Sequence, residues 1–190
     1  MESENTEKEP ANGKKKSLIS MGPWGGNGGT SWDDGIYDGV REIKLVYDRC
    51  IDSIRVVYDK NGKPFTAEKH GGVGGNKTAE IKLQYPHEKL TSVSGHYCPV
   101  VRGTSSVIRS LAFKSNKRTF GPFGVEDGTP FTLSMDGGLI VGFNGRSGWY
   151  LDAIGFRISR AQTPPFCQRV LKALHLLTCT RSSVPKDDEN

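Results

Sequence analysis

Short runs in which hydrophobic and polar residues alternate fill the middle of the chain, from about residue 22 to residue 160. Each run has the length of a strand and is bounded by Gly, Asn, Asp or Pro, which is typical of an all-β sandwich or barrel. No segment of this region keeps a helical period long enough to compete. Strands are predicted in eight runs: REIKLVYD, DSIRVVYD, AEIKLQY, LTSVSGHY, VIRSLAFKS, FTLSM, LIVGFNG and LDAIGFRIS.

Three of these runs align with one another and indicate an internal repeat. When the run that begins at Asp52 is laid over the run that begins at Val107, hydrophobic residues and an asparagine coincide. The run LDAIGFRI aligns with the same two runs when Asp152 is placed opposite Asp52. Three units of about 50 residues would fill the region, so we expect a threefold all-β architecture. Only two of the three units carry a carboxylate at the aligned position.

The two ends of the chain have a different composition. Residues 1–20 are charged and without periodicity, which predicts a disordered arm before a domain that spans 21–160. The tail, 161–190, contains an apolar stripe at helical spacing, which predicts a short amphipathic helix. The stripe is formed by Phe166, Val170, Leu174 and Leu177. Docking on the domain and binding of a partner or a membrane surface both stay open as roles for this helix.

Charge and composition argue against several classes of protein. The net charge of +5 is modest, and the basic residues are dispersed instead of forming a stripe, which disfavours nucleic-acid binding. No apolar run approaches the roughly 20 residues that cross a bilayer, so no transmembrane segment is expected. The N-terminal arm lacks the apolar region of a secretory signal. We therefore expect a cytoplasmic protein, or one that is also nuclear.

Catalytic and metal-binding patterns are not evident in the sequence. The four cysteines are scattered without CxxC spacing and the histidines show no metal spacing, so neither a metal nor a cofactor is expected. Asp52 and Asp152 lie in different repeat units, which argues against the closely spaced carboxylates of a glycosidase. No nucleophile motif is present, and we expect a protein that is not an enzyme.

Two glycine-rich stretches and one GxxxD motif carry the candidate chemistry. The stretches GPWGGNGGTSWDDG and HGGVGG place glycine where the backbone needs positive φ or where something approaches the main chain closely. In GRSGWYLDAIG, Asp152 follows Gly148 by four residues. Its carboxylate can accept from two neighbouring hydroxyls, which sugars present, while the NH groups of Trp149 and Tyr150 can donate. The alternatives are a turn-capping aspartate and core aromatic residues.

Five motifs occur together in the order and approximate spacing of the jacalin-related lectins. They are GPWGGNGGTSWDDG, HGGVGG, FGPFG, GTPF and GRSGWYLDAIG, and the similarity to the mannose-specific branch covers about residues 22–158. The resemblance implies a β-prism, in which three four-stranded Greek-key sheets surround a pseudo-threefold axis. It also implies a lectin for mannose- or glucose-type sugars and mannose-rich glycans, with an intact glycine loop and without catalysis, cofactor or metal.

The resemblance further implies a sugar site at one end of the prism. Gly29 would offer its backbone NH, and Gly148 would let the GxxxD loop fold toward the ligand. Trp149 and Tyr150 would donate main-chain NH groups. Asp152 would accept from two sugar hydroxyls.

Some members of the family carry a second site in the equivalent loop of another unit. Here that loop reads DRCID, and Asp48 stands where the motif has glycine. The candidate residues of this second carbohydrate site are Gly75, Arg49, Cys50 and Asp52. The third unit reads TSSVI, without an aspartate, and is expected not to bind sugar.

A monosaccharide held by a few hydrogen bonds should bind weakly, because each bond exchanges with water for only about 0.5 to 1.5 kcal/mol net. Useful avidity then requires several sites, so we expect a homo-oligomer that binds multivalent glycans, by analogy with the family. The competing hypothesis is a β-prism protein-interaction module with weak or lost sugar binding.

Overall fold

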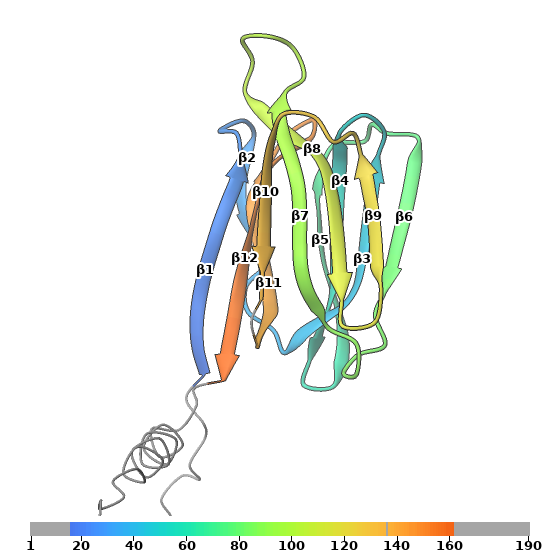
Figure 1. Cartoon of the computed structure of the whole chain (residues 1–190), viewed down its shortest axis with the longest axis vertical. Coiled ribbons are helices and arrows are strands. Elements are labelled where there is room, and N and C mark those ends of the chain that lie inside the picture. Colours follow the sequence, from blue (N-terminus) through green and yellow to red (C-terminus); the bar gives the residue numbers. More distant parts are fainter. Residues whose placement is uncertain (1–15, 136, 162–190) are drawn as a thin grey trace, which may run out of the picture. The chain divides into compact units, whose positions relative to one another are not determined.

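Three sheets of four strands make up the computed structural model, which describes residues 16–135 and 137–161 and contains no helix within those ranges. The strands are β1 (Lys16–Gly25), β2 (Thr30–Asp33), β3 (Gly39–Tyr47), β4 (Ile51–Lys60), β5 (Lys63–Gly71), β6 (Lys77–Lys82), β7 (Leu90–Pro99), β8 (Ser106–Ser115), β9 (Thr119–Gly124), β10 (Thr129–Ser134), β11 (Gly138–Ser147) and β12 (Leu151–Ala161). The expected all-β fold of three four-stranded sheets is confirmed (Figure 1).

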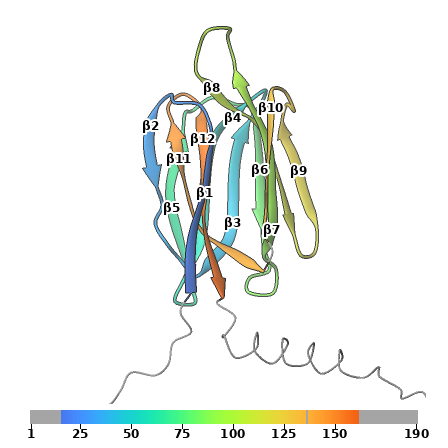
Figure 2. The same ribbon diagram turned by 60° about the vertical axis from the view of Figure 1, so that its left-hand side comes forward.

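Each sheet is one unit of the repeat. The first unit has the strand order β1-β12-β11-β2, the second β5-β4-β3-β6 and the third β10-β7-β8-β9. Figure 2 shows the three sheets side by side around a shared interior. The core draws on all three units and includes the fully buried side chains of Ile43, Ile54, Ile108, Leu111, Phe143 and Phe156.

Four strands are missed by the sequence pattern: β1, β2, β5 and β9. All four lie at sheet edges, where one side of the strand has no partner in its sheet. Edge strands tolerate proline and glycine and bury fewer side chains, so their alternation is weak. Pro23 lies within β1 and Pro122 within β9. Since β1 begins at Lys16, residues 16–20 belong to the first sheet and not to the arm expected there. Residues 1–15 and the expected tail helix lie outside the described residues.

A bulge interrupts the pairing of the two central strands in every unit. The residue that is skipped is Asp152 between β11 and β12, Asp52 between β3 and β4, and Arg109 between β7 and β8. The repeat alignment in the third unit was therefore wrong by two residues, because Arg109 and not Val107 corresponds to the aspartates. A shift of two residues preserves the inward and outward alternation of a strand, so hydrophobicity alone could not reject it.

A glycine packs against the bulge in each unit and explains part of the glycine content. A Cβ on Gly25 would lie 2.2 Å from the carbonyl oxygen of Asp152, and one on Gly71 would lie 2.1 Å from that of Asp52. Both glycines have positive φ, at 129° and 112°. These contacts bring the β1–β2 and β5–β6 loops against the bulges at the end of the prism shown uppermost in Figure 1.

Candidate functional site

The carboxylate of Asp152 lies where the loop at residues 25–29, the first glycine loop, meets the GxxxD loop at residues 148–152. The main chain of the two loops is joined by a hydrogen bond from Gly26 N to Asp152 O at 2.9 Å. Asp152 is only 7% exposed, and its Oδ2 atom is buried without a hydrogen-bond partner. A buried carboxylate oxygen left unpaired is costly, so this atom points to a ligand that supplies a donor.

Glycines keep the space around this carboxylate open. A Cβ on Gly28 would lie 2.5 Å from Oδ1 of Asp152, and a Cβ on Gly29 would lie 2.6 Å from Oδ2. The nearest atom to a Cβ on Gly148 would be the Cα of Gly29, at 3.3 Å. Side chains at positions 28 and 29 would therefore cover the carboxylate, which gives the run GGNGG its physical reason.

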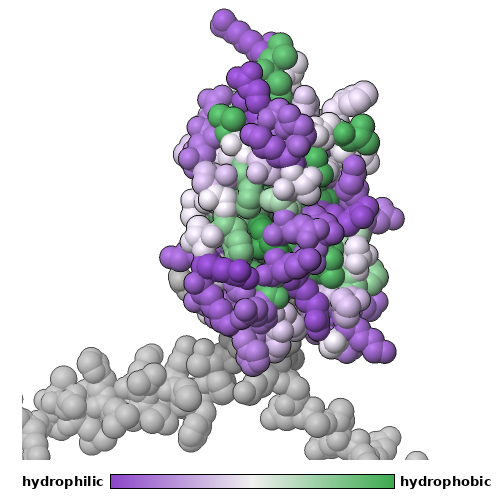
Figure 3. Space-filling view, turned by 90° about the vertical axis from the view of Figure 1, so that its right-hand side faces the viewer, coloured by the Kyte–Doolittle hydropathy of each residue, from purple (hydrophilic) through white to green (hydrophobic). Residues whose placement is uncertain are grey.

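A pocket of about 650 Å³ opens beside the carboxylate. All five residues expected at the first site line it: Gly29, Gly148, Trp149, Tyr150 and Asp152. The β7–β8 loop of the third unit also lines the pocket, with Val100, Val101, Thr104 and Ser105. This loop rises above the other loops in Figure 1, and Figure 3 shows apolar and strongly hydrophilic residues next to each other at this end. The sequence pattern gave no sign that the third unit contributes to the pocket.

The two aromatic residues of the GxxxD loop differ in exposure. Trp149 is 83% exposed, which excludes the core role that the sequence left open for it, and Tyr150 is partly buried. A hydrogen bond from Gly148 N to Tyr150 O at 3.0 Å closes the turn that contains Trp149. The indole of Trp149 is therefore available at the rim of the pocket.

The ionisation of Asp152 is set by opposing influences. Burial raises the pKa of its carboxyl, while a backbone NH at Gly148 and the positive charge of Arg146 lower it. The net result is a raised pKa. Donors from a ligand would favour the ionised form, because a hydrogen bond to the carboxylate stabilises its charge.

The second unit repeats much of this arrangement around Asp52, which is 5% exposed. A Cβ on Gly74 would lie 2.5 Å from Oδ1 of Asp52, and a Cβ on Gly75 would lie 2.7 Å from Oδ2. Asp48 takes the place of Gly148, since its NH donates to the Cys50 carbonyl at 3.1 Å. Burial and the negative charge of Asp48 both raise the pKa of Asp52.

The other two residues of the candidate second site, Arg49 and Cys50, take the loop positions that Trp149 and Tyr150 have in the first unit. Cys50 is buried as a free thiol, whereas Arg49 is exposed and makes no ion pair with another described residue. The carboxylate of Asp48 lies 3.9 Å from Lys77 Nζ. The structure thus brings Gly75 close to Asp52 and leaves the Arg49 side chain exposed, as the Trp149 side chain is at the first site.

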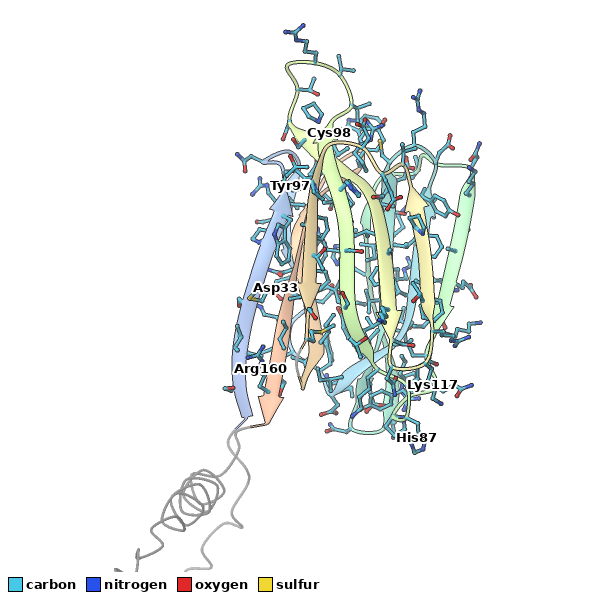
Figure 4. The ribbon with its side chains drawn as sticks, viewed as in Figure 1. Asp33, His87, Tyr97, Cys98, Lys117 and Arg160 are labelled. Carbon is cyan, nitrogen blue, oxygen red and sulfur yellow. The ribbon has the colours of Figure 1, made fainter. Side chains whose placement is uncertain are left out.

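In the third unit the bulge carries a cation in place of a carboxylate. The side chain of Arg109 is 8% exposed, and its Nη2 lies 3.7 Å from Oδ2 of Asp127. The thiol of Cys98 donates to the same oxygen at 3.7 Å. Figure 4 labels Cys98 at the end of β7, beside the base of the β7–β8 loop. That the third unit does not bind sugar stays a prediction, and the pairing of Arg109 with Asp127 gives a physical reason for it.

Residues 16–135 and 137–161 are the part of the chain that the structure describes. This part of the chain holds no group of three or more His, Cys, Asp or Glu side chains that could hold a metal ion. Nor does it contain a helix of the length and apolarity that a membrane crossing requires.

Comparisons with known proteins agree with this geometry. The model of the jacalin-like lectin domain matches residues 21–157. Jacalin-related lectin 19 from Arabidopsis thaliana is 67% identical over 166 residues, which cover 87% of this chain and 94% of that protein. A galactose-specific lectin from Morus indica is 45% identical over 152 residues, covering 77% of this chain and 95% of the relative.

Solved structures show the same fold. A mannose-specific jacalin-related lectin from Morus nigra, in complex with mannose, has a TM-score of 0.73 and 49% identity, and the match covers 79% of this chain and 99% of that one. The relatives are lectins, which bind carbohydrate without catalysis. With a family model that spans the three sheets and a relative that matches nearly along its full length, this chain belongs to the jacalin-related lectins.

Proposed function

We propose that the chain binds mannose- or glucose-type sugars and mannose-rich glycans at the pocket beside Asp152. The observation that carries the proposal is the buried, unpartnered Oδ2 of Asp152 in the lining of an open pocket. Two neighbouring sugar hydroxyls would donate to its two oxygens. The NH groups of Gly29, Trp149 and Tyr150 would donate to sugar oxygens.

Mannose preference is supported by two observations. The first glycine loop runs without interruption from β1 into β2, and a mannose-specific lectin in complex with mannose shares the fold at 49% identity. Because a galactose-specific lectin is also 45% identical, overall similarity does not decide between the sugars. Titration with both sugars therefore tests the preference for mannose over galactose.

The decisive experiment is calorimetric titration of the full chain with methyl α-mannoside and methyl α-galactoside. The wild type should bind the mannoside more tightly, and Asp152→Ala should abolish binding. The matched control is Asp52→Ala, which removes the equivalent carboxylate of the second unit and should leave the affinity unchanged. Binding should also persist in strong chelator, since no metal takes part. A folded wild type that binds neither sugar would overturn the proposal and favour an interaction module.

Homo-oligomerisation and a cytoplasmic location belong to the same proposal. Since a single site of a few hydrogen bonds is weak, multivalent glycans should bind more tightly than the monosaccharide. Analytical ultracentrifugation should show an oligomer, and an equal affinity for mannose-rich glycan and methyl α-mannoside would contradict it. Fractionation of cells should place the protein in the cytosol.

A further inference from the structure

The first glycine loop is held by a side chain from another unit. The hydroxyl oxygen of Ser105, in the β7–β8 loop, accepts hydrogen bonds from Asn27 N at 3.0 Å and from Gly28 N at 3.1 Å. Two successive NH groups of the loop are thus fixed by one oxygen. Glycine loses more conformational freedom on ordering than other residues, so such external contacts matter most in a glycine-rich loop.

A second side chain holds the carbonyl groups of the same loop. Arg146, near the end of β11, donates from Nε to Gly28 O at 2.9 Å and from Nη2 to Gly29 O at 2.7 Å. Hydrogen bonds from a charged guanidinium are stronger than neutral ones, and its planar geometry fixes the direction of both carbonyls. Together, Ser105 and Arg146 make four hydrogen bonds to the main chain of residues 27–29.

The second glycine loop, residues 71–75, provides an internal comparison. The position of Arg146 in the first unit is that of Val46 in the second, since Arg146 pairs with Ala153 and Val46 pairs with Ser53, each one residue after the bulge. Valine has no donor. The γ-methyl group of Val46 would instead lie 2.9 Å from a Cβ on Gly75.

The counterpart of Ser105 is also missing at the second loop. A Cβ on Gly26 would lie 2.2 Å from the Ser106 carbonyl oxygen, and one on Gly72 would lie 2.3 Å from the Trp149 carbonyl oxygen. Ser106 and Trp149 therefore support the two loops in the same way. The residue before Trp149 is Gly148, which has no hydroxyl to offer.

We propose that Ser105 and Arg146 are positioning residues that hold the first glycine loop in the shape required for sugar binding, and that the second glycine loop binds sugar weakly or not at all because it lacks both. The inference rests on the proposed function and explains why two loops that each surround a buried aspartate with glycines are not equivalent. Preorganisation of a loop increases affinity because less freedom is lost on binding.

The electrostatics of the two aspartates support the same distinction. Besides bonding the loop, Arg146 lowers the pKa of Asp152 through its charge. At the second unit the nearby charge is that of Asp48, which raises the pKa of Asp52. Arg146 therefore both holds the first glycine loop and favours the ionised form of Asp152.

The test compares Ser105→Ala with two controls, Ser105→Thr, which keeps the hydroxyl, and Ser106→Ala, which removes a neighbouring hydroxyl. Amide hydrogen exchange in the sugar-free protein reports on the loop, and calorimetry with methyl α-mannoside reports on affinity. Ser105→Ala should accelerate exchange at Asn27 and Gly28 and weaken binding by about threefold to tenfold, the effect expected when hydrogen bonds are lost. Both controls should behave like the wild type.

Further measurements in the same experiment separate this inference from the proposed function. In the wild type, exchange should be slower at Gly28 than at its counterpart Gly74. Ser105→Ala should remove this difference, because the Gly28 NH donates to Ser105. Arg146→Met, which frees the carbonyl groups of Gly28 and Gly29, should reduce it. Unchanged exchange and affinity in Ser105→Ala, or faster exchange with unchanged affinity, would overturn the positioning role. If the wild type binds no mannoside, the proposed function fails, whereas faster exchange in Ser105→Ala still supports the role of Ser105 in holding the loop.

Discussion

The phenolic OH of Tyr58 donates a hydrogen bond of 2.6 Å to Oδ2 of Asp34 and joins the second unit to the first. The phenolic oxygen of Tyr58 also accepts from Phe143 N at 3.0 Å, and the Tyr58 side chain is fully buried. Tyr58→Phe would leave a buried NH unpaired, so we expect a loss of about 1 to 3 kcal/mol in the free energy of unfolding. Urea denaturation measures this loss.

The control for Tyr58→Phe is Tyr85→Phe, because the OH of Tyr85 makes only an exposed bond of 3.4 Å to Asp38 O. This variant should change stability little. Sugar affinity should be unaltered in both, since neither tyrosine lines the pocket beside Asp152. Equal stability losses in the two variants would show that the link from Tyr58 to Asp34 and Phe143 has no special weight.

A methyl group at Gly29 should block sugar binding. The Cβ would lie 2.6 Å from Oδ2 of Asp152 and 2.2 Å from the Ser147 carbonyl oxygen. Gly29→Ala should therefore weaken binding of methyl α-mannoside by at least about tenfold, the equivalent of one lost charge-assisted hydrogen bond. Calorimetry measures this affinity, and a Gly29→Ala variant that binds as tightly as the wild type would contradict the placement of the sugar site beside Gly29.

Gly62→Ala is the matched control for the backbone strain of that substitution. Gly62 has a positive φ of 78°, as Gly29 has one of 57°, but a Cβ there meets nothing within 4 Å. Both variants should lose some stability, because alanine is disfavoured at positive φ. Only Gly29→Ala should lose sugar binding.

The affinity for sugar should fall in acid. Burial raises the pKa of Asp152, so its carboxylate takes up a proton at a higher pH than an ordinary aspartate does. The ionised form accepts two hydroxyl hydrogen bonds, and below its pKa the affinity should fall by about tenfold per pH unit. Titrations with mannoside between pH 7 and pH 4, with folding checked by circular dichroism, would show the fall. An affinity independent of pH would contradict the role given to Asp152.

Stability in acid should depend on Glu88 and Arg118. Hydrogen bonds from Arg118, at 2.9 Å to Oε1, lower the pKa of the buried Glu88 carboxyl to about 2. Because the folded pKa lies below the unfolded one, this stabilisation is present above about pH 4.5 and is lost as the pH falls toward 2. Glu88→Gln should lower stability at pH 7 by about 1 to 3 kcal/mol and flatten this part of the pH dependence.

Urea denaturation at a series of pH values tests this expectation. Glu126→Gln is the control, since Glu126 is exposed and forms no ion pair within the described residues. It should leave both the stability and the pH profile unchanged. A Glu88→Gln variant that keeps the wild-type profile would assign the acid sensitivity to other carboxylates.

The central strands could be predicted from the sequence because their buried faces impose strict alternation. Two edge strands, β6 and β10, were predicted as well, whereas the edge strands β1, β2, β5 and β9 were not, because few of their side chains are buried in alternation. The motif with Gly148 and Asp152 located the pocket, and the structure brings these residues together with Gly29. Whether they bind sugar stays a prediction.

The rest of the candidate site depends on contacts between units. Ser105 lies 78 residues from Asn27 in the chain, and only the packing of the third unit on the first brings them together. Arg146 stands inside the quoted motif GRSGW, so its position was visible, but its contact with Gly28 required the fold. The register of Arg109 was missed because a two-residue shift leaves the hydrophobic pattern intact.

The three units share the same backbone bulge but carry different side chains at it, namely Asp152, Asp52 and Arg109. In every unit a glycine packs against the carbonyl group of the bulge residue, whichever side chain that residue carries. Equivalent positions of the three units therefore carry Asp152, Asp52 beside the like charge of Asp48, and Arg109 paired with Asp127. The charge of the side chain at the bulge can therefore differ between units while the bulge itself is kept.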